Sequence, residues 1–515
     1  MVNISLKRDW PYIVFLLVSL IVSVFPRLPF MHRLSANWRS DQTLLTSFWF
    51  QKEGISLFHS QLPLYGPPWE VPFEFPVYQA ISAIFSNITH LNLTASSRVV
   101  SAASFYLSAF FLLLLCLEFL NNRTLSAIIF LVYLYLPYDI RYSTEILIDY
   151  LSVALALGYI FCIKKFWDSP RNYLLCILAI IFGCLGAVVK ITTMAIIIIP
   201  AILITLDGFQ TWGIKFEDLT APKEIIAKIG RQKLSFLLLT AIVLLPILSA
   251  GLWTNFTDSI KQSNIFTVWL TSANLTAWNF GTLDQKISFT SWWNWLTKIN
   301  NQFFLGGILL LFPLLGIVFL YKMPLKSRGF FGAALTGTLF AIFIFFNLFL
   351  HEYYYIAVSA YVSVLIGFGI FCLFKFLLPH KIWWIVFGGI FFLFIFMKGL
   401  EQYRVKQAEV QAEVDYVLTK IIPLANRVAA TTPEDKYIIS FQSNWYPDFI
   451  LYTKRKGLVI SPVEDSKFSC ELINKYDYST IVIVDRPPDT PELLGIFNCF
   501  KSVQLIKPGI YKINP

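Results

Sequence analysis

Long apolar runs separated by short polar segments fill residues 1–400 of the chain. An apolar stretch of about 20 residues is long enough to cross a bilayer as a helix. The pattern therefore predicts an all-α polytopic membrane domain with about eleven transmembrane helices. The expected spans are residues 11–28, 99–120, 124–137, 147–163, 173–189, 191–207, 234–252, 303–321, 329–350, 353–374 and 382–399.

The pattern changes near residue 400, where an amphipathic helix over residues 400–430 is expected to leave the membrane. Beyond it, alternating short apolar segments predict a small α/β domain within residues 401–515. KYIISFQ, TIVIVD and SVQLIKPGIYKI are expected to form strands, and PDFILYTKRKG and PELLGIFNCF to form helices. No glycine-rich phosphate loop is present in this region.

Composition agrees with a membrane protein, because 57% of the residues are hydrophobic and only 14% are charged. Soluble domains carry about a quarter charged residues. The net charge of +10 is explained by topology rather than by nucleic acid, because Lys and Arg are concentrated in alternate short connections. This alternation predicts a cytoplasmic N-terminus in a plasma membrane, here of the bacterial inner-membrane type. The long loops 29–98 and 253–302 and the C-terminal domain are then extracytoplasmic.

The seven cysteines show no metal-ligand spacing, and five of them lie in apolar runs. Cys470 and Cys499 lie in the polar tail and could pair in an oxidising compartment. No metal site or other cofactor is predicted, although a divalent metal is left open.

The first outer loop contains Asp41, within RSDQTLLTSFWFQKEG, and further along it Glu74. Asp41 has two interpretations: a solvated residue that caps a helix together with Ser40, or a general base at the membrane surface. A carboxylate near low-dielectric walls has a raised pKa, which favours proton abstraction.

The short outer link YDIRYSTEILID carries Arg141, Glu145 and Asp149. Glu145 and Asp149 are four residues apart and are expected to share one face of a helix. Asp149 begins an apolar run, where a carboxylate is costly unless it has a partner or a wet cavity. Its simpler interpretation is an interfacial position with Arg141 as the counter-ion.

Lys190 interrupts GCLGAVVK-ITTMAIIIIP, and His351 begins HEYYY, which includes Tyr353 and Tyr354. Lys190 is either a lysine that reaches toward the interface or an anchor for an anionic lipid headgroup. His351 belongs either to an aromatic belt or to a phosphate site flanked by tyrosines. All these residues are predicted on the outer face. A base together with a cationic cluster there suits the transfer of a group from a lipid phosphate.

Taken together, these features make residues 5–400 of the chain resemble the GT-C superfamily of polytopic glycosyltransferases. The resemblance is closer to bacterial relatives of the protein O-mannosyltransferases and of the lipid A aminoarabinose transferase. Asp41-Gln42 matches their acidic loop motif, usually Asp-Glu, so Gln42 stands where a second acid is usual. Four later segments match in order: YGPPWEVPFEFPVYQAI (65–81), RYSTEILIDYLSVALALG (141–158), GCLGAVVKITTMAIIIIPAIL (183–203) and HEYYYIAVSAYVSVLIGFGI (351–370).

The resemblance implies a polyprenyl- or dolichyl-phosphate sugar as the donor, taken from the outer leaflet. Asp41 would remove a proton from a lipid, glycan or protein acceptor, which would attack the anomeric carbon with inversion. Lys190, with Arg141 and His351, would hold the departing phosphate. Glu74, Glu145, Asp149, Tyr353 and Tyr354 would support the site.

Two other functions fit parts of the pattern. A secondary transporter or flippase agrees with the number of spans, but it predicts charges near the bilayer midplane rather than at one interface. A non-catalytic protein of the same fold that binds a lipid-linked sugar agrees with the missing second acid.

Overall fold

The computed structural model describes residues 6–204 and 233–514, apart from residues 32, 36, 198, 379–380, 463–469 and 488–489. The chain divides into two compact units. The first comprises Met1–Met31, Ser101–Leu252 and Thr276–Arg404, and the second comprises His32–Val100, Trp253–Leu275 and Val405–Pro515. The second unit therefore combines most of the first long loop, part of the second long loop and the polar tail.

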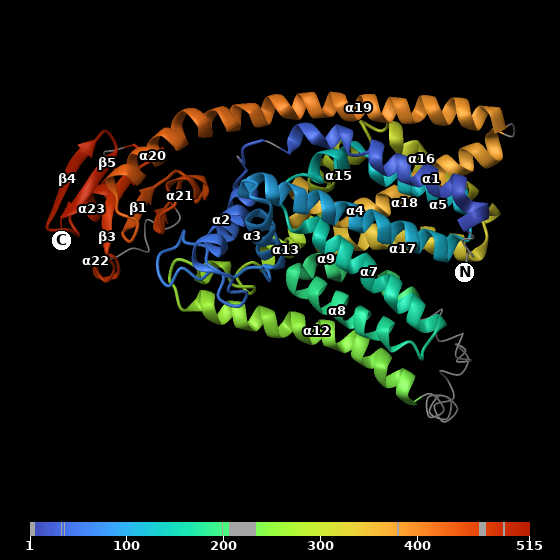
Figure 1. Ribbon diagram of the computed structural model, residues 1–515, viewed down its shortest axis with the longest axis horizontal. Helices are drawn as coiled ribbons and strands as arrows, with labels where there is room; N and C mark the ends of the chain where they lie inside the picture. The colour runs from blue at the N-terminus through green and yellow to red at the C-terminus, as the bar shows by residue number, and fades with distance from the viewer. Residues whose placement is uncertain are drawn as a thin grey trace. The chain divides into compact units, whose positions relative to one another are not determined.

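The first unit is helical (Figure 1). Three helices, α4, α12 and α19, have a part in each unit. The helices with residues in the first unit are α1 (Leu6–Val22), η1 (Phe25–Phe30), α4 (Leu93–Leu120), α5 (Arg123–Tyr135), α6 (Pro137–Tyr142), α7 (Asp149–Asp168), α8 (Tyr173–Val189), α9 (Ile191–Ile196), α12 (Lys233–Gln262), α13 (Thr276–Phe280), α14 (Leu283–Ile287), α15 (Phe289–Phe303), η4 (Ile308–Leu310), α16 (Leu311–Phe319), η5 (Leu320–Lys322), α17 (Leu325–Ile344), η6 (Leu348–Leu350), η7 (Glu352–Tyr355), α18 (Ile356–Cys372), η8 (Leu373–Leu377) and α19 (Lys381–Tyr416).

Six helical segments of the described chain are long and apolar enough to cross a membrane, or up to seven if the bent pair Phe289–Phe303 and Ile308–Lys322 forms one span. The expected number of eleven spans is therefore not confirmed. Arg123–Tyr135 and Tyr173–Val189 are apolar but shorter, and the end of the expected span 191–207 lies outside the described residues. The six segments are Trp10–Phe30, Leu93–Leu120, Asp149–Asp168, Leu234–Gln262, Leu325–Ile344 and Glu352–Leu377.

Helix α18 lies at the centre of the first unit. All its residues except Ala357 are buried, and it packs against α5, α7, α16 and α17. A helix that is apolar all round is buried either in lipid or among other helices, and other helices surround this one. The segment Glu352–Tyr355 immediately before α18 is therefore held by the best-packed helix of this unit.

The second unit contains two helices from the first long loop and a small α/β region from the tail. Its elements are α2 (Trp38–Glu53), α3 (Val77–Thr89), η3 (Val268–Leu270), η9 (Val417–Ile421), α20 (Ile422–Thr431), β1 (Tyr437–Phe441), α21 (Asp448–Thr453), β2 (Gly457–Ile460), α22 (Cys470–Asn474), β3 (Tyr478–Ile483), α23 (Pro491–Phe497), β4 (Ser502–Lys507) and β5 (Ile510–Asn514).

The five strands form one mixed sheet in the order β2-β1-β3-β5-β4. Strand β1 is parallel to β2 and β3, whereas β5 is antiparallel to β3 and β4. The predicted α/β domain is confirmed in its coarse form. Two details are wrong: GLVI at 457–460 forms an unpredicted strand, and the single strand expected at 502–513 is a hairpin that turns at Pro508-Gly509.

Residues of the first long loop cover the outer edge of β2. The backbone N–H of Val459 donates to the carbonyl of Leu64 at 2.8 Å, and that of Gly457 donates to Pro63 at 3.2 Å. Leu458 also forms a β-bridge with Tyr65. Backbone groups at a sheet edge need partners when they are buried. The loop and the tail therefore depend on each other to satisfy these groups.

Cys470 and Cys499 form a disulfide across a sequence separation of 29 residues. A cross-link of this span limits the unfolded chain and contributes about 3 kcal/mol to stability. We expect a reducing agent to lower the melting temperature of the full-length protein. The double variant Cys470→Ser/Cys499→Ser should melt at that lower temperature in either condition, and Cys184→Ser should behave as wild type. Equal melting of the oxidised and reduced protein would contradict this role.

Candidate functional site

Glu352, in the short helix η7, lies at the centre of a polar cluster in the first unit. Glu352 forms an ion pair with Arg141 of α6 at 3.3 Å, and its carboxylate accepts a hydrogen bond from the Tyr142 hydroxyl at 3.0 Å. The Tyr138 hydroxyl donates to the Glu352 backbone carbonyl at 2.7 Å. These contacts fix Arg141, a predicted phosphate ligand, against the HEYYY segment.

Lys190 forms a buried ion pair with Asp149 in the same unit. Lys190 lies in extended backbone between α8 and α9, and Asp149 is the first residue of α7. The lysine Nζ lies 4.5 Å from the ring centre of Tyr354 and 5.6 Å from that of Tyr353. Four predicted residues are thus brought together, with the cation held between a carboxylate and two aromatic faces.

His351 joins this cluster through its aromatic neighbours. Its ring centre lies 4.8 Å from Trp278 and 6.3 and 6.4 Å from Tyr353 and Tyr354. Burial and the nearby positive charge of Lys298 lower the pKa of His351. The imidazole is therefore neutral at pH 7 and offers a hydrogen bond rather than a positive charge.

The prediction that Glu145 and Asp149 share one face of a helix is wrong. Helix α7 begins only at Asp149, and residues 143–148 form turns in which the backbone N–H of Leu147 donates to the Glu145 carbonyl at 2.8 Å. The four-residue spacing predicts a common face only when the helix covers both positions. Asp149 pairs with Lys190, whereas Glu145 contributes charge near Arg141.

Sequence reasoning missed three charged residues of this region. Glu352 is the partner of Arg141, and Lys298 donates to the Leu350 carbonyl at 3.0 Å beside His351. Asp139 is fully buried and accepts a hydrogen bond from Tyr150 at 2.7 Å. Burial raises the pKa of Asp139 to about 7. The sequence feature that could have identified Asp139 is its position two residues before Arg141.

Asp41 lies in the second unit, on the first turn of α2. The alternative that Ser40-Asp41 caps this helix is wrong, because Asn37 is the cap and accepts from the Arg39 backbone N–H at 3.0 Å. Asp41 is also buried, with an exposed fraction of 1%. Burial, followed by the negative charge of Asp41, raises the pKa of Tyr452. Asp41 is thus a buried acid near a tyrosine of the tail.

A small polar pocket lies along α2, next to Arg39 and Gln42. Arg39 forms an ion pair with Glu74 and donates to the Gln42 side chain at 2.6 Å. Gln42 therefore accepts a hydrogen bond from a neighbouring arginine side chain. The pocket is lined by Arg39, Gln42, Thr43, Thr46, Ser60, Leu62, Val71, Phe73, Glu74, Pro76 and Gln79.

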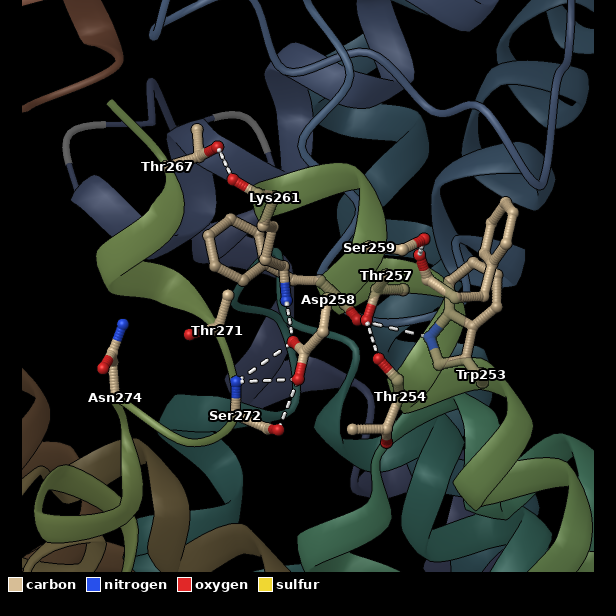
Figure 2. Close-up of polar contacts among 12 residues, drawn as sticks. Trp253, Thr254, Thr257, Asp258, Ser259, Lys261, Thr267, Thr271, Ser272 and Asn274 are labelled. Atoms are coloured by element: carbon tan, nitrogen blue, oxygen red, sulfur yellow. Dashed lines mark hydrogen bonds and ion pairs between the residues drawn. The ribbon is translucent and has the colours of Figure 1, made fainter. Parts of the chain in front are cut away.

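The segment after α12 is tied back to that helix by Asp258, as Figure 2 shows. The Asp258 carboxylate accepts hydrogen bonds from the backbone N–H of Ser272, at 3.0 and 3.1 Å, and from its hydroxyl. It also forms an ion pair with Lys261 at 3.7 Å. These contacts fix residues 263–275, which include the two aromatic residues Phe266 and Trp269.

The predicted site residues are divided between the two units. Arg141, Glu145, Asp149, Lys190, His351, Tyr353 and Tyr354 belong to the first, and Asp41 and Glu74 belong to the second. The convergence of Asp41, Lys190 and His351 on one pocket therefore stays a prediction. Among residues 6–204 and 233–514, outside the short gaps, no three His, Cys, Asp or Glu side chains are grouped as metal ligands.

Comparison with known protein families and with curated protein sequences gave no match. Solved structures do match. ArnT from Cupriavidus metallidurans bound to undecaprenyl phosphate aligns over 99% of this chain and 100% of its own, with a TM-score of 0.58 and 10% identity. Its apo structure aligns over the same shares, with a TM-score of 0.60 and 9% identity.

A second fold likeness is to the archaeal oligosaccharyltransferase AglB from Archaeoglobus fulgidus, in complex with an inhibitory peptide and a dolichol-phosphate. The alignment covers 93% of this chain and 70% of the AglB chain. The TM-score is 0.53 and the identity is 13%. At such identities the comparisons establish a shared fold.

Proposed function

Given the GT-C fold of this chain, we propose that it is a membrane glycosyltransferase that moves a sugar from a polyprenyl phosphate to an acceptor. The observation that carries the proposal is the buried Lys190–Asp149 pair beside Tyr353, Tyr354 and Arg141. A buried ion pair is costly, and within membrane-spanning segments such groups commonly serve a function. The two structural neighbours were solved with undecaprenyl phosphate and dolichol-phosphate, which are both polyprenyl phosphates.

The first unit would bind the phosphate of the donor. Lys190 would bind the phosphate as a point charge, and Arg141 would add planar hydrogen-bond donors. A neutral His351 would donate one further hydrogen bond. Both cations are already paired with acids, so the phosphate would have to share or replace Asp149 and Glu352. The oriented cations would stabilise the charge that gathers on the phosphate as it leaves.

The bond changes follow from these roles. The acceptor oxygen or nitrogen would attack the anomeric carbon as the bond from that carbon to the phosphate oxygen breaks. The bonding electron pair would leave with the polyprenyl phosphate, and the acceptor proton would pass to the Asp41 carboxylate. Attack from the face opposite the phosphate would invert the anomeric carbon. Burial of Asp41, which is 1% exposed, supports its role, because a buried base is shielded from bulk water during the proton transfer.

The reaction would take place at the outer face of a plasma membrane. The alternation of Lys and Arg in the connections supports an N-terminus in the cytoplasm and a tail outside it. The Cys470–Cys499 disulfide supports the same orientation, because such bonds persist in oxidising compartments.

A donor screen tests the proposal. The full-length protein in lipid nanodiscs would receive undecaprenyl phosphates that carry different radiolabelled sugars, with a membrane extract as the acceptor. We expect label to move from one donor into the extract, with release of undecaprenyl phosphate. Binding of a donor without transfer would instead identify a non-catalytic lipid-sugar-binding protein, which the amide at Gln42 in place of a second acid would then explain. No binding of any donor would overturn the proposal.

A further inference from the structure

Aromatic rings from several separate segments meet around Trp445 in the second unit. The Trp445 ring centre lies 4.9 Å from Trp38 of α2, 5.8 Å from Trp269 of η3 and 6.1 Å from Tyr65 of the loop. Tyr65 is fully buried beneath the group, whereas the three tryptophans are partly exposed. We call Trp38, Trp269 and Trp445 the tryptophan cluster. These positions are far apart in the sequence, so only the fold assembles them.

Each tryptophan of the cluster is held in place by its surroundings. The Trp269 indole N–H donates to the Phe266 carbonyl at 3.0 Å, and the contacts of Asp258 with Ser272 fix the rest of that segment (Figure 2). Helix α2, which carries Trp38, packs against α21, which follows Trp445. Rings fixed in this way lose little conformational entropy when a ligand binds.

Acidic and hydroxyl groups lie in the tail segment next to Trp445. Asp485 accepts hydrogen bonds from the Ser443 backbone N–H, at 2.6 Å, and from the Ser443 hydroxyl. Asp448 begins α21, and burial, with a further contribution from the charge of Asp485, raises its pKa to about 6. A carboxylate that loses solvation in this way gains from each hydrogen-bond donor that a ligand supplies.

The tryptophan cluster is close to Asp41 within the same unit. Trp38 precedes Asp41 by less than one turn of α2, and Tyr452 follows Asp448 by about one turn of α21. The negative charges of Asp41 and Asp448 both contribute to the raised pKa of Tyr452. A ligand seated on these tryptophans would therefore lie near the proposed base.

We propose that the tryptophan cluster, together with Asp448 and Asp485, binds the pyranose rings of a glycan acceptor. A pyranose presents a face of C–H groups and an edge of hydroxyls. The negative faces of aromatic rings attract the C–H groups, and carboxylates accept from the hydroxyls. A lipid chain would need aliphatic side chains instead of acids at this place. The inference rests on the proposed function, because it names the acceptor class for Asp41.

Saturation-transfer NMR with cellotriose and chitotriose tests the inference on the full-length protein in lipid nanodiscs without added donor. We expect at least one trisaccharide to bind, and Trp269→Ala to weaken its affinity about tenfold. Trp269→Phe should recover part of the loss. Trp293→Ala is the matched control, because Trp293 is 60% exposed and lies outside the cluster, and it should bind as wild type.

A melting temperature equal to that of wild type establishes that Trp269→Ala is folded. Failure of both trisaccharides to bind, or equal binding by folded Trp269→Ala, would overturn the inference. Binding of an unglycosylated decapeptide at the same place would overturn it too, in favour of a peptide acceptor. Undecaprenyl phosphate binding is measured separately: its absence from wild type would count against the proposed function and leave trisaccharide binding as an independent result.

Discussion

The variant Asp41→Asn is expected to lose sugar transfer by a factor of at least about one hundred, which is the usual contribution of a general base. Asparagine keeps the shape of the buried side chain but cannot accept the acceptor proton. Donor binding should remain, because the proposed phosphate ligands belong to the first unit. The rate is measured as label transferred from the donor found in the screen, under single-turnover conditions.

Glu53→Gln is the matched control for this variant. Glu53 lies at the last residue of the same helix, α2, and forms an exposed ion pair with Lys456 at 2.8 Å. The substitution removes the same charge at a cost of less than about 1 kcal/mol. It should transfer sugar at the wild-type rate. If Asp41→Asn also retained that rate, Asp41 would have no part in proton transfer.

The variant Lys190→Met is expected to weaken donor binding and stability together. It removes the cation proposed to hold the phosphate, which should lower affinity about tenfold or more. It also leaves Asp149 buried without its partner, which costs about 3 to 5 kcal/mol. Affinity for undecaprenyl phosphate and the melting temperature report these two effects separately.

The double variant Lys190→Met/Asp149→Asn separates phosphate binding from folding. With both charges removed, stability should return toward wild type while donor affinity stays low. Asp149→Asn alone keeps the lysine and frees it from its carboxylate, so a folded sample should bind the donor at least as tightly as wild type. Wild-type donor affinity in the double variant would leave Lys190 a structural residue.

Hydropathy predicted most of the local structure because burial in a bilayer or in a helical core needs apolar residues in long runs. Every expected span with described residues contains helix. The number of spans was less determined, because Arg123–Tyr135 and Tyr173–Val189 are apolar but short for a crossing. Composition alone does not separate a short span from a helix buried among others.

One of the two errors in the tail arose where tertiary contacts decide the structure, and the other arose at a turn that had a local signal. GLVI at 457–460 is a short apolar run, and its sequence is compatible with either a helix or a strand. It forms a strand because β1 and the loop residues Pro63 and Leu64 pair with it. The hairpin at Pro508-Gly509 had a local signal, since proline and glycine favour turns.

The sequence predicted which residues belong to the candidate site better than it predicted their ion-pair partners. The sequence marked Arg141, Asp149, Lys190 and His351 as charged or polar residues within or beside apolar runs. It did not identify Glu352 as the partner of Arg141, nor Asp149 as the partner of Lys190 rather than of Arg141. Ion pairs join residues that are distant in the chain, so spacing along it carries little information about them.

The sequence by itself determined that the chain is a helical membrane protein with a small α/β tail, and it marked polar positions that are costly to bury. The period and length of apolar runs are local properties, and they decide secondary structure. Only the tertiary structure decided that Lys190 pairs with Asp149, and that Trp38, Trp269 and Trp445 meet. Such contacts depend on packing between distant segments, and that packing is set by the burial of whole helices and strands rather than by their neighbours in sequence.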